Sequence, residues 1–126
     1  MRMENLLFVA LGGALGASAR YGLSLLPAKG DFPVMTLLTN LLGALLIGFV
    51  VGLAGQNGWS QGRLLFWKTG VCGGFTTFST FSLESLNLLQ KGKAGPAGLY
   101  ILLSVAGCLA GVALGQALAR RAGGRI

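Results

Sequence analysis

Four long apolar stretches take up most of the chain and constrain its fold more than any other feature. They run over about residues 5–26, 33–55, 64–89 and 97–119 of 126. A helix needs about 20 apolar residues to cross a bilayer, so each stretch is long enough and only short connections remain. Charged residues make up 10% of the chain, against about 25% in an ordinary soluble domain. The sequence therefore predicts an all-α integral membrane protein with four transmembrane helices, forming a single domain over residues 1–126.

The first stretch has a second interpretation, as a cleaved signal peptide. Its apolar run ends in Ala17-Ser18-Ala19, which imitates the small-residue cleavage site of such peptides. However, the chain begins with a single cation, Arg2, which Glu4 offsets, and the apolar pattern resumes after Arg20. Because a signal peptide needs a cationic start, the sequence favours a retained helix.

The net charge of +7 comes from ten cations that lie mainly at the ends of the apolar stretches. No basic stripe alternates with aromatics as a nucleic-acid surface requires, so these cations are expected to meet anionic lipid headgroups instead. The chain has no His, and its acids are Glu4, Asp31 and Glu84. Side chains for catalysis or for metal binding are therefore almost absent, and we expect no enzyme.

The cations also bear on how the chain is oriented in the membrane. Six would lie on the side of the amino terminus (Arg2, Arg63, Lys68, Arg120, Arg121 and Arg125) and four on the other (Arg20, Lys29, Lys91 and Lys93). A firmly oriented protein shows a clear excess of cations on its cytoplasmic side. The weak bias here leaves the orientation undecided and is compatible with insertion in both orientations.

Glycine recurs at four-residue spacing in three of the stretches. The sets are Gly12 and Gly16; Gly48 and Gly52; and Gly107, Gly111 and Gly115. Four residues are about one helical turn, so each set lies along one face and lets another backbone approach closely. We expect tight packing between the helices and against a partner chain.

The third stretch contains a segment that is weak as a helix. Seven hydroxyl residues lie between Thr69 and Ser85, together with three glycines and three phenylalanines (Gly70, Gly73, Gly74, Phe75, Phe78 and Phe81). Glycine inside a helix costs about 1 kcal/mol relative to alanine, and the β-branched pair Thr76-Thr77 adds strain. In lipid, carbonyls freed by a break need water or a cation. The sequence therefore predicts a third helix broken in mid-membrane, beside a cavity or an ion.

Several polar and aromatic side chains suit an anion path beside such a break. Phe78 and Phe81 are three residues apart, so they share a face, and the edge of each ring is positive. Asn40 supplies an amide donor in the second stretch, and Arg20 either snorkels to the surface or marks an anion entrance. A weakly polar stripe in the fourth stretch consists of Tyr100, Ser104 and Cys108. Taken singly, each hydroxyl has the alternative of bonding to its own helix.

Three runs of residues resemble the Fluc family of bacterial fluoride channels. They are residues 12–21 (GGALGASARY), Thr36-Leu37 with Asn40 and Gly43, and residues 70–82 (GVCGGFTTFSTFS). The resemblance covers nearly the whole chain, and its third run is the most specific. It implies an antiparallel homodimer of dual topology in the bacterial cytoplasmic (inner) membrane. It further implies passive, selective export of fluoride through two pathways, with a structural sodium ion (Na⁺) at the dimer interface.

Matching positions in the resemblance imply roles for individual residues. Sodium would be held by the backbone carbonyls of Gly73 and Thr76 from both protomers, and Arg20 would lie at the vestibule. The fluoride pathway would be lined by Phe78, Phe81, Asn40, Ser79, Thr80, Tyr100 and Ser104. The chain departs from the family at two positions: Met35 stands where glycine is expected, and Cys108 stands where a hydroxyl is common. No role is assigned to Glu84.

Two other classes of membrane protein have a similar size. A dual-topology multidrug exporter of four helices needs a carboxylate deep in its first helix to couple drugs to protons, whereas Glu4 lies at the extreme terminus. A non-catalytic membrane subunit would explain the glycine faces but not the hydroxyl-rich segment. The sequence therefore favours the fluoride channel.

Overall fold

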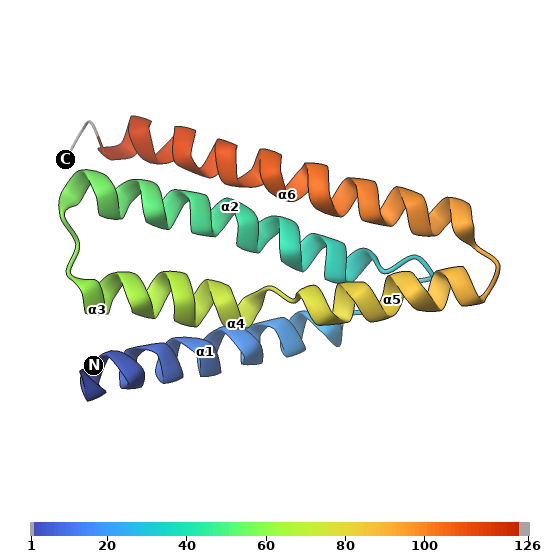
Figure 1. The fold of residues 1–126 in the computed structure, drawn as a ribbon, viewed down its shortest axis with the longest axis horizontal. Helices are drawn as coiled ribbons and strands as arrows, with labels where there is room; N and C mark the ends of the chain where they lie inside the picture. The colour runs from blue at the N-terminus through green and yellow to red at the C-terminus, as the bar shows by residue number, and fades with distance from the viewer. Residues whose placement is uncertain (1, 124–126) are drawn as a thin grey trace.

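The computed structural model describes residues 2–123, and every regular element in that range is helical. Three helices are long: α1 (Met3–Ser24), α2 (Val34–Asn57) and α6 (Ala94–Gly123). Between α2 and α6 the chain forms four shorter elements: α3 (Gln61–Leu64), the π-helix η1 (Leu65–Cys72), α4 (Gly73–Phe75) and α5 (Phe78–Gln90). These four follow one another along a single line, and the chain enters and leaves the fold at the same end (Figure 1).

The long helices α1, α2 and α6 are each apolar and long enough to cross a membrane. Most large apolar side chains of α1 and α6 are exposed, among them Leu11, Leu15, Leu102 and Leu109. Exposed leucines in such number suit lipid rather than water. The chain is thus an all-helical, multi-pass membrane protein. Arg125, which was counted in the charge bias, lies outside the described residues.

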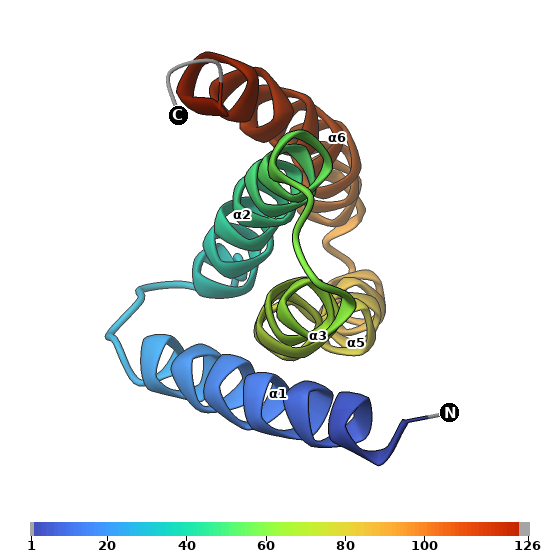
Figure 2. The ribbon, with the colours of Figure 1, turned by 90° about the vertical axis from the view of Figure 1, so that its left-hand side faces the viewer.

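The helices form two closely packed pairs. One pair is α1 with the η1–α4 segment, and the other is α2 with α6. Viewed from the end, α1 lies below the line of α3 to α5, and α2 and α6 lie above it (Figure 2). The two pairs are joined mainly where α2 meets η1 and where α5 meets α6.

Glycines let α1 approach the η1–α4 segment at backbone contact. A Cβ atom added to Gly12 or Gly16 would collide with backbone atoms of η1. From the other side, a Cβ on Gly70 would lie 2.8 Å from the Cα of Gly12, and one on Gly74 would lie 2.6 Å from the carbonyl oxygen of Gly13. These glycines are therefore required for packing, and Gly70 and Gly74 remain helical.

The pair α2–α6 is built in the same way. A Cβ on Gly48 would collide with the carbonyl oxygen of Val112, and one on Gly115 with that of Leu45. A Cβ on Gly52 would lie 2.5 Å from the Cβ of Ala119. The prediction that the glycine faces pack against other helices is confirmed, and the partner helix belongs to the same chain at each of these positions.

The helix ends differ slightly from the sequence prediction. Helix α6 begins at Ala94, before Pro96. A proline is tolerated there because in the first turn it removes only an N–H that has no helical acceptor.

At the same end of the fold, Asp31 accepts a hydrogen bond from Lys93 and lies 3.9 Å from the Nζ atom of Lys91. The bond from Lys93 and the charge of Lys91 hold the pKa of Asp31 below its usual range. These contacts tie the α1–α2 loop to the α5–α6 loop.

Candidate functional site

The helical line from α3 to α5 is interrupted at two threonines. Thr76 has φ −87° and ψ 158°, and Thr77 has φ −149° and ψ 114°, so both are extended. The extended residues are thus the β-branched pair, which favours this backbone. Gly73 and Gly74 remain helical. Each hydroxyl then closes one helix end: Thr76 donates to the carbonyl of Cys72 at 2.9 Å, and Thr77 accepts from the N–H of Thr80 at 3.1 Å.

Asn40 on α2 holds the backbone of the interruption. Its Oδ1 accepts the N–H of Thr77 at 2.8 Å, and its Nδ2 donates to the carbonyl of Thr77 at 3.1 Å. One amide side chain thus satisfies both polar groups of a residue that has left the helix. In lipid an unsatisfied backbone group costs several kcal/mol, so this pair of bonds makes the interruption tolerable.

The two carbonyls predicted to bind sodium lose their helical donors. In a continuous α-helix the N–H of Thr77 would bond the carbonyl of Gly73, and that of Thr80 would bond the carbonyl of Thr76. Here the first N–H donates to Asn40 and the second to the hydroxyl of Thr77. Gly73 is exposed, and it lines a cavity together with Thr76.

Arg20 reaches the other side of the interruption from α1. Its Nε donates to the carbonyl of Gly74 at 3.1 Å, near the carboxyl end of α4. A cation near the carboxyl end of a helical segment is favourably placed against the partial negative charge of its carbonyls. Arg20 also lines a cavity, together with Thr39, Thr77 and Thr80.

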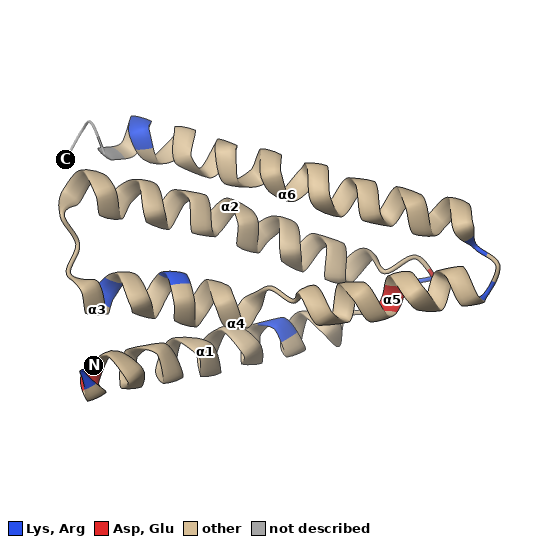
Figure 3. Cartoon of the chain, in the orientation of Figure 1, with Lys and Arg blue, Asp and Glu red and all other residues tan. Residues whose placement is uncertain are grey.

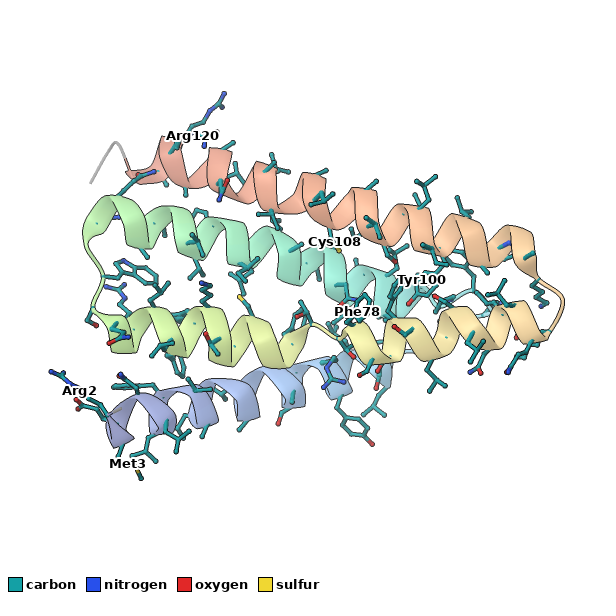
Figure 4. All side chains as sticks on the ribbon, viewed as in Figure 1. Arg2, Met3, Phe78, Tyr100, Cys108 and Arg120 are labelled. Carbon is teal, nitrogen blue, oxygen red and sulfur yellow. The ribbon has the colours of Figure 1, made fainter. Side chains whose placement is uncertain are left out.

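Three cavities follow one another from the Asp31 loop to the interruption. The first, of about 380 Å³, is lined by Asp31, Thr36 and Glu84 among others. The second, of about 110 Å³, shares Thr36 and adds Arg20, Thr39, Thr77 and Thr80. The third, of about 250 Å³, shares Thr77 and adds Asn40, Gly73, Thr76, Phe78 and Cys108. Figure 4 shows Phe78 beside the interruption, and Cys108 on the side of α6 that faces the other helices.

The two predicted path phenylalanines differ in their surroundings. Phe78 is 77% exposed, whereas Phe81 is 8% exposed and packs against Tyr100 with ring centroids 5.1 Å apart. The Phe78 and Phe81 rings contact each other at 5.6 Å. The predicted shared face is thus present, with one ring on the surface of the chain and the other in its core.

Glu84 is the polar residue that sequence reasoning left without a role. One of its carboxylate oxygens accepts from Tyr100 at 3.0 Å, and the other accepts from Thr36 at 3.1 Å. Each hydroxyl therefore points its proton at Glu84. The signal was present in the sequence, because Glu84 is the one acid within an apolar stretch, and such residues are usually functional.

The remaining predicted residues are dispersed. Ser104 is buried, and its hydroxyl has no hydrogen-bond partner among the described residues. Ser79 is exposed, with its oxygen 3.4 Å from that of Thr77. The structure thus brings Asn40, Gly73, Thr76 and Phe78 to one cavity, while Arg20 and Thr80 line the adjoining one.

A family model described as CrcB-like protein, Camphor Resistance (CrcB), matches residues 7–116. The chain belongs to the CrcB family. A CrcB relative from Ruminiclostridium cellulolyticum is 48% identical over 122 residues, which cover 94% of each chain. A second, from a Ruegeria species, is 50% identical over 120 residues, covering 92% of this chain and 94% of the relative. Both are named fluoride-specific ion channel FluC, so the resemblance found in the sequence is confirmed. Because an ion channel is not an enzyme, membership of this family also confirms the expectation that the chain is no enzyme.

Proposed function

We propose that this protein is a fluoride-selective, passive channel that exports fluoride across the bacterial cytoplasmic membrane. The observation that carries the proposal is the succession of three cavities that leads to an interrupted helix. Fluoride is proposed as the ion because relatives that are 48% and 50% identical are named fluoride-specific ion channels. Irregular backbone inside a membrane is tolerated where it lines a water-filled path, which is the setting a channel provides.

The polar groups along the second and third cavities suit a small, strongly hydrated anion. Fluoride must exchange water for other hydrogen-bond donors, and the donors must release it again for conduction to occur. Arg20, which lines the second cavity, has N–H groups beyond the one bound to Gly74. The ring edge of Phe78, which lines the third cavity, adds weak positive potential. Such a lining favours fluoride without holding it tightly.

The segment from α3 to α5 is proposed to be the fourth membrane crossing. It runs beside α2 over a comparable length (Figure 1). Its interruption leaves backbone groups that a membrane interior would penalise, and these groups are partly satisfied by Asn40, Arg20 and the hydroxyls of Thr76 and Thr77. In this proposal the third of the four helices is broken in mid-membrane, and the bonds just named make the break compatible with lipid.

Fluoride flux from liposomes tests the proposal. Vesicles loaded with fluoride and chloride, with a potassium ionophore to balance charge, should release fluoride while chloride remains inside. Phe78→Ile should lose this flux, whereas Phe8→Ile, at another partly exposed phenylalanine outside the three cavities, should retain it. Equal chloride release, or no fluoride release from the wild-type protein, would contradict a fluoride-selective channel.

A sodium ion and a second, antiparallel copy complete the proposed assembly. The freed carbonyls of Gly73 and Thr76 are oxygen ligands of the kind that hard cations prefer. They lie beside Phe78, a large apolar side chain that is exposed in the single chain. Pairing two copies over this face would bury the ring and bring four carbonyl oxygens around one ion.

Replacing sodium with a bulky organic cation tests this assembly. Size-exclusion chromatography in sodium should give a dimer, and in N-methylglucamine the dimer should weaken and fluoride flux should fall. The physical reason is that four converging carbonyl dipoles repel one another when no cation lies between them. A dimer and a flux that are unchanged after exhaustive sodium removal would disprove the structural ion.

A further inference from the structure

Lys68 is a cation in an unusual position. The other cations of the described chain, apart from Arg20, lie near helix ends and loops, whereas Lys68 lies within η1 (Figure 3). Its side chain is exposed and has no ion-pair partner among the described residues. The three acids are engaged elsewhere: Glu4 with Arg2, Asp31 with two lysines, and Glu84 with two hydroxyls.

The π-helical geometry of η1 sets the direction in which Lys68 points. A π-helix joins residues five apart, and the N–H of Gly73 indeed bonds the carbonyl of Lys68. Residues four and five positions later therefore lie above Lys68 on the same face, and these are Cys72 and Gly73. Both line the 250 Å³ cavity beside the interruption. Gly70, which contacts α1, lies on the opposite face.

We propose that Lys68 is an anion-attracting group at the end of the pathway opposite to Arg20, and that it sets fluoride conduction at low concentration. The inference rests on the proposed channel function. An unpaired cation one turn below a cavity raises the local concentration of anions there, and low-dielectric walls strengthen the effect. Arg20 would serve one mouth and Lys68 the other.

Replacing Lys68 by residues with and without charge tests the inference in liposomes at low ionic strength. Lys68→Met keeps the length and removes the charge. It should lower flux about tenfold at low fluoride, the lower limit for electrostatic steering, while leaving saturating flux near wild type. Lys68→Arg should retain wild-type flux. Added impermeant salt should bring the wild type down to the level of Lys68→Met, because it screens the charge.

The control is Arg120→Gln, which removes one cation at the same end of the fold. Arg120 points away from the other helices in Figure 4, so its loss should leave flux unchanged. Equal flux of the wild type and Lys68→Met at low fluoride overturns the inference while leaving the channel function intact. An equal loss in Lys68→Arg overturns it as well, because shape would then matter rather than charge. A wild-type protein without fluoride flux overturns both proposals.

Discussion

Asn40→Leu abolishes fluoride flux and lowers the stability of the protein by about 3 kcal/mol or more. The substitution removes the acceptor for the N–H of Thr77 and the donor to its carbonyl at once. A buried backbone group that loses its partner costs about 1–3 kcal/mol, and more in lipid, and two such groups are affected here. The interruption then either refolds into a helix or admits water, and both outcomes change the cavity beside Gly73.

The control lies on the same helix. The Nδ2 of Asn57 donates to the carbonyl of Leu53 at 3.0 Å, but this bond is exposed and local. Asn57→Leu should therefore change stability by about 0.5 kcal/mol or less, as surface substitutions usually do. Thermal unfolding in detergent and liposome flux give two independent measurements. An Asn40→Leu protein with wild-type values in both measurements would show that the two hydrogen bonds between Asn40 and Thr77 are dispensable.

Asn40→Asp separates the two bonds. An ionised carboxylate still accepts the N–H of Thr77 but cannot donate to its carbonyl. It also places a negative charge in the cavity through which the anion is proposed to pass. We expect loss of flux with a smaller loss of stability than in Asn40→Leu, because one of the two bonds persists.

The sequence predicts the helices well because each depends on local apolar length. A stretch of about 20 apolar residues needs no knowledge of its neighbours to be recognised as a membrane helix. The glycine faces are equally local, since four-residue spacing alone places Gly12 and Gly16 on one side of α1. Both kinds of prediction follow from properties of a single helix.

The details of the site depend on contacts between distant parts of the chain, and the sequence alone did not reveal them. Arg20 bonds a carbonyl 54 residues later, and Asn40 bonds a residue 37 positions later. Such bonds decide that the chain extends at Thr76 and Thr77 rather than at the glycines before them. The glycines signal weakness in the isolated sequence, but in the fold Gly70 and Gly74 are engaged by α1.

Glu84 is a second residue whose contacts with distant parts of the chain could not be predicted from the sequence. The sequence shows an acid inside an apolar stretch, and the structure adds that Thr36 and Tyr100 both donate to it. Tyr100 was predicted as a contact for fluoride, yet its proton is already directed at a carboxylate. A direct role for the Tyr100 hydroxyl in binding an anion would require that bond to break first.

Gly12→Ala separates α1 from the η1–α4 segment, whereas Gly13→Ala at the next position does not. A Cβ on Gly12 would overlap the carbonyl oxygen of Phe66 and lie 2.9 Å from the Cα of Gly70. Both obstacles are backbone atoms, so no side chain can rotate away and the two helices must move apart. Overpacking of this kind costs about 1–3 kcal/mol, and the upper part of that range is expected here because α1 meets η1 at glycine backbone.

Gly13 provides a control on the same turn of the same helix. Apart from the neighbouring backbone of α1, no atom of the described residues lies within 4 Å of a Cβ placed there, and alanine improves helix propensity by about 1 kcal/mol. The two variants should therefore shift the thermal unfolding temperature in detergent in opposite directions. Separation of α1 also withdraws Arg20 from the carbonyl of Gly74, so Gly12→Ala should lose fluoride flux while Gly13→Ala conducts normally. If Gly12→Ala is as stable and as conductive as Gly13→Ala, then close backbone contact between α1 and η1 is not what holds Arg20 at the interruption.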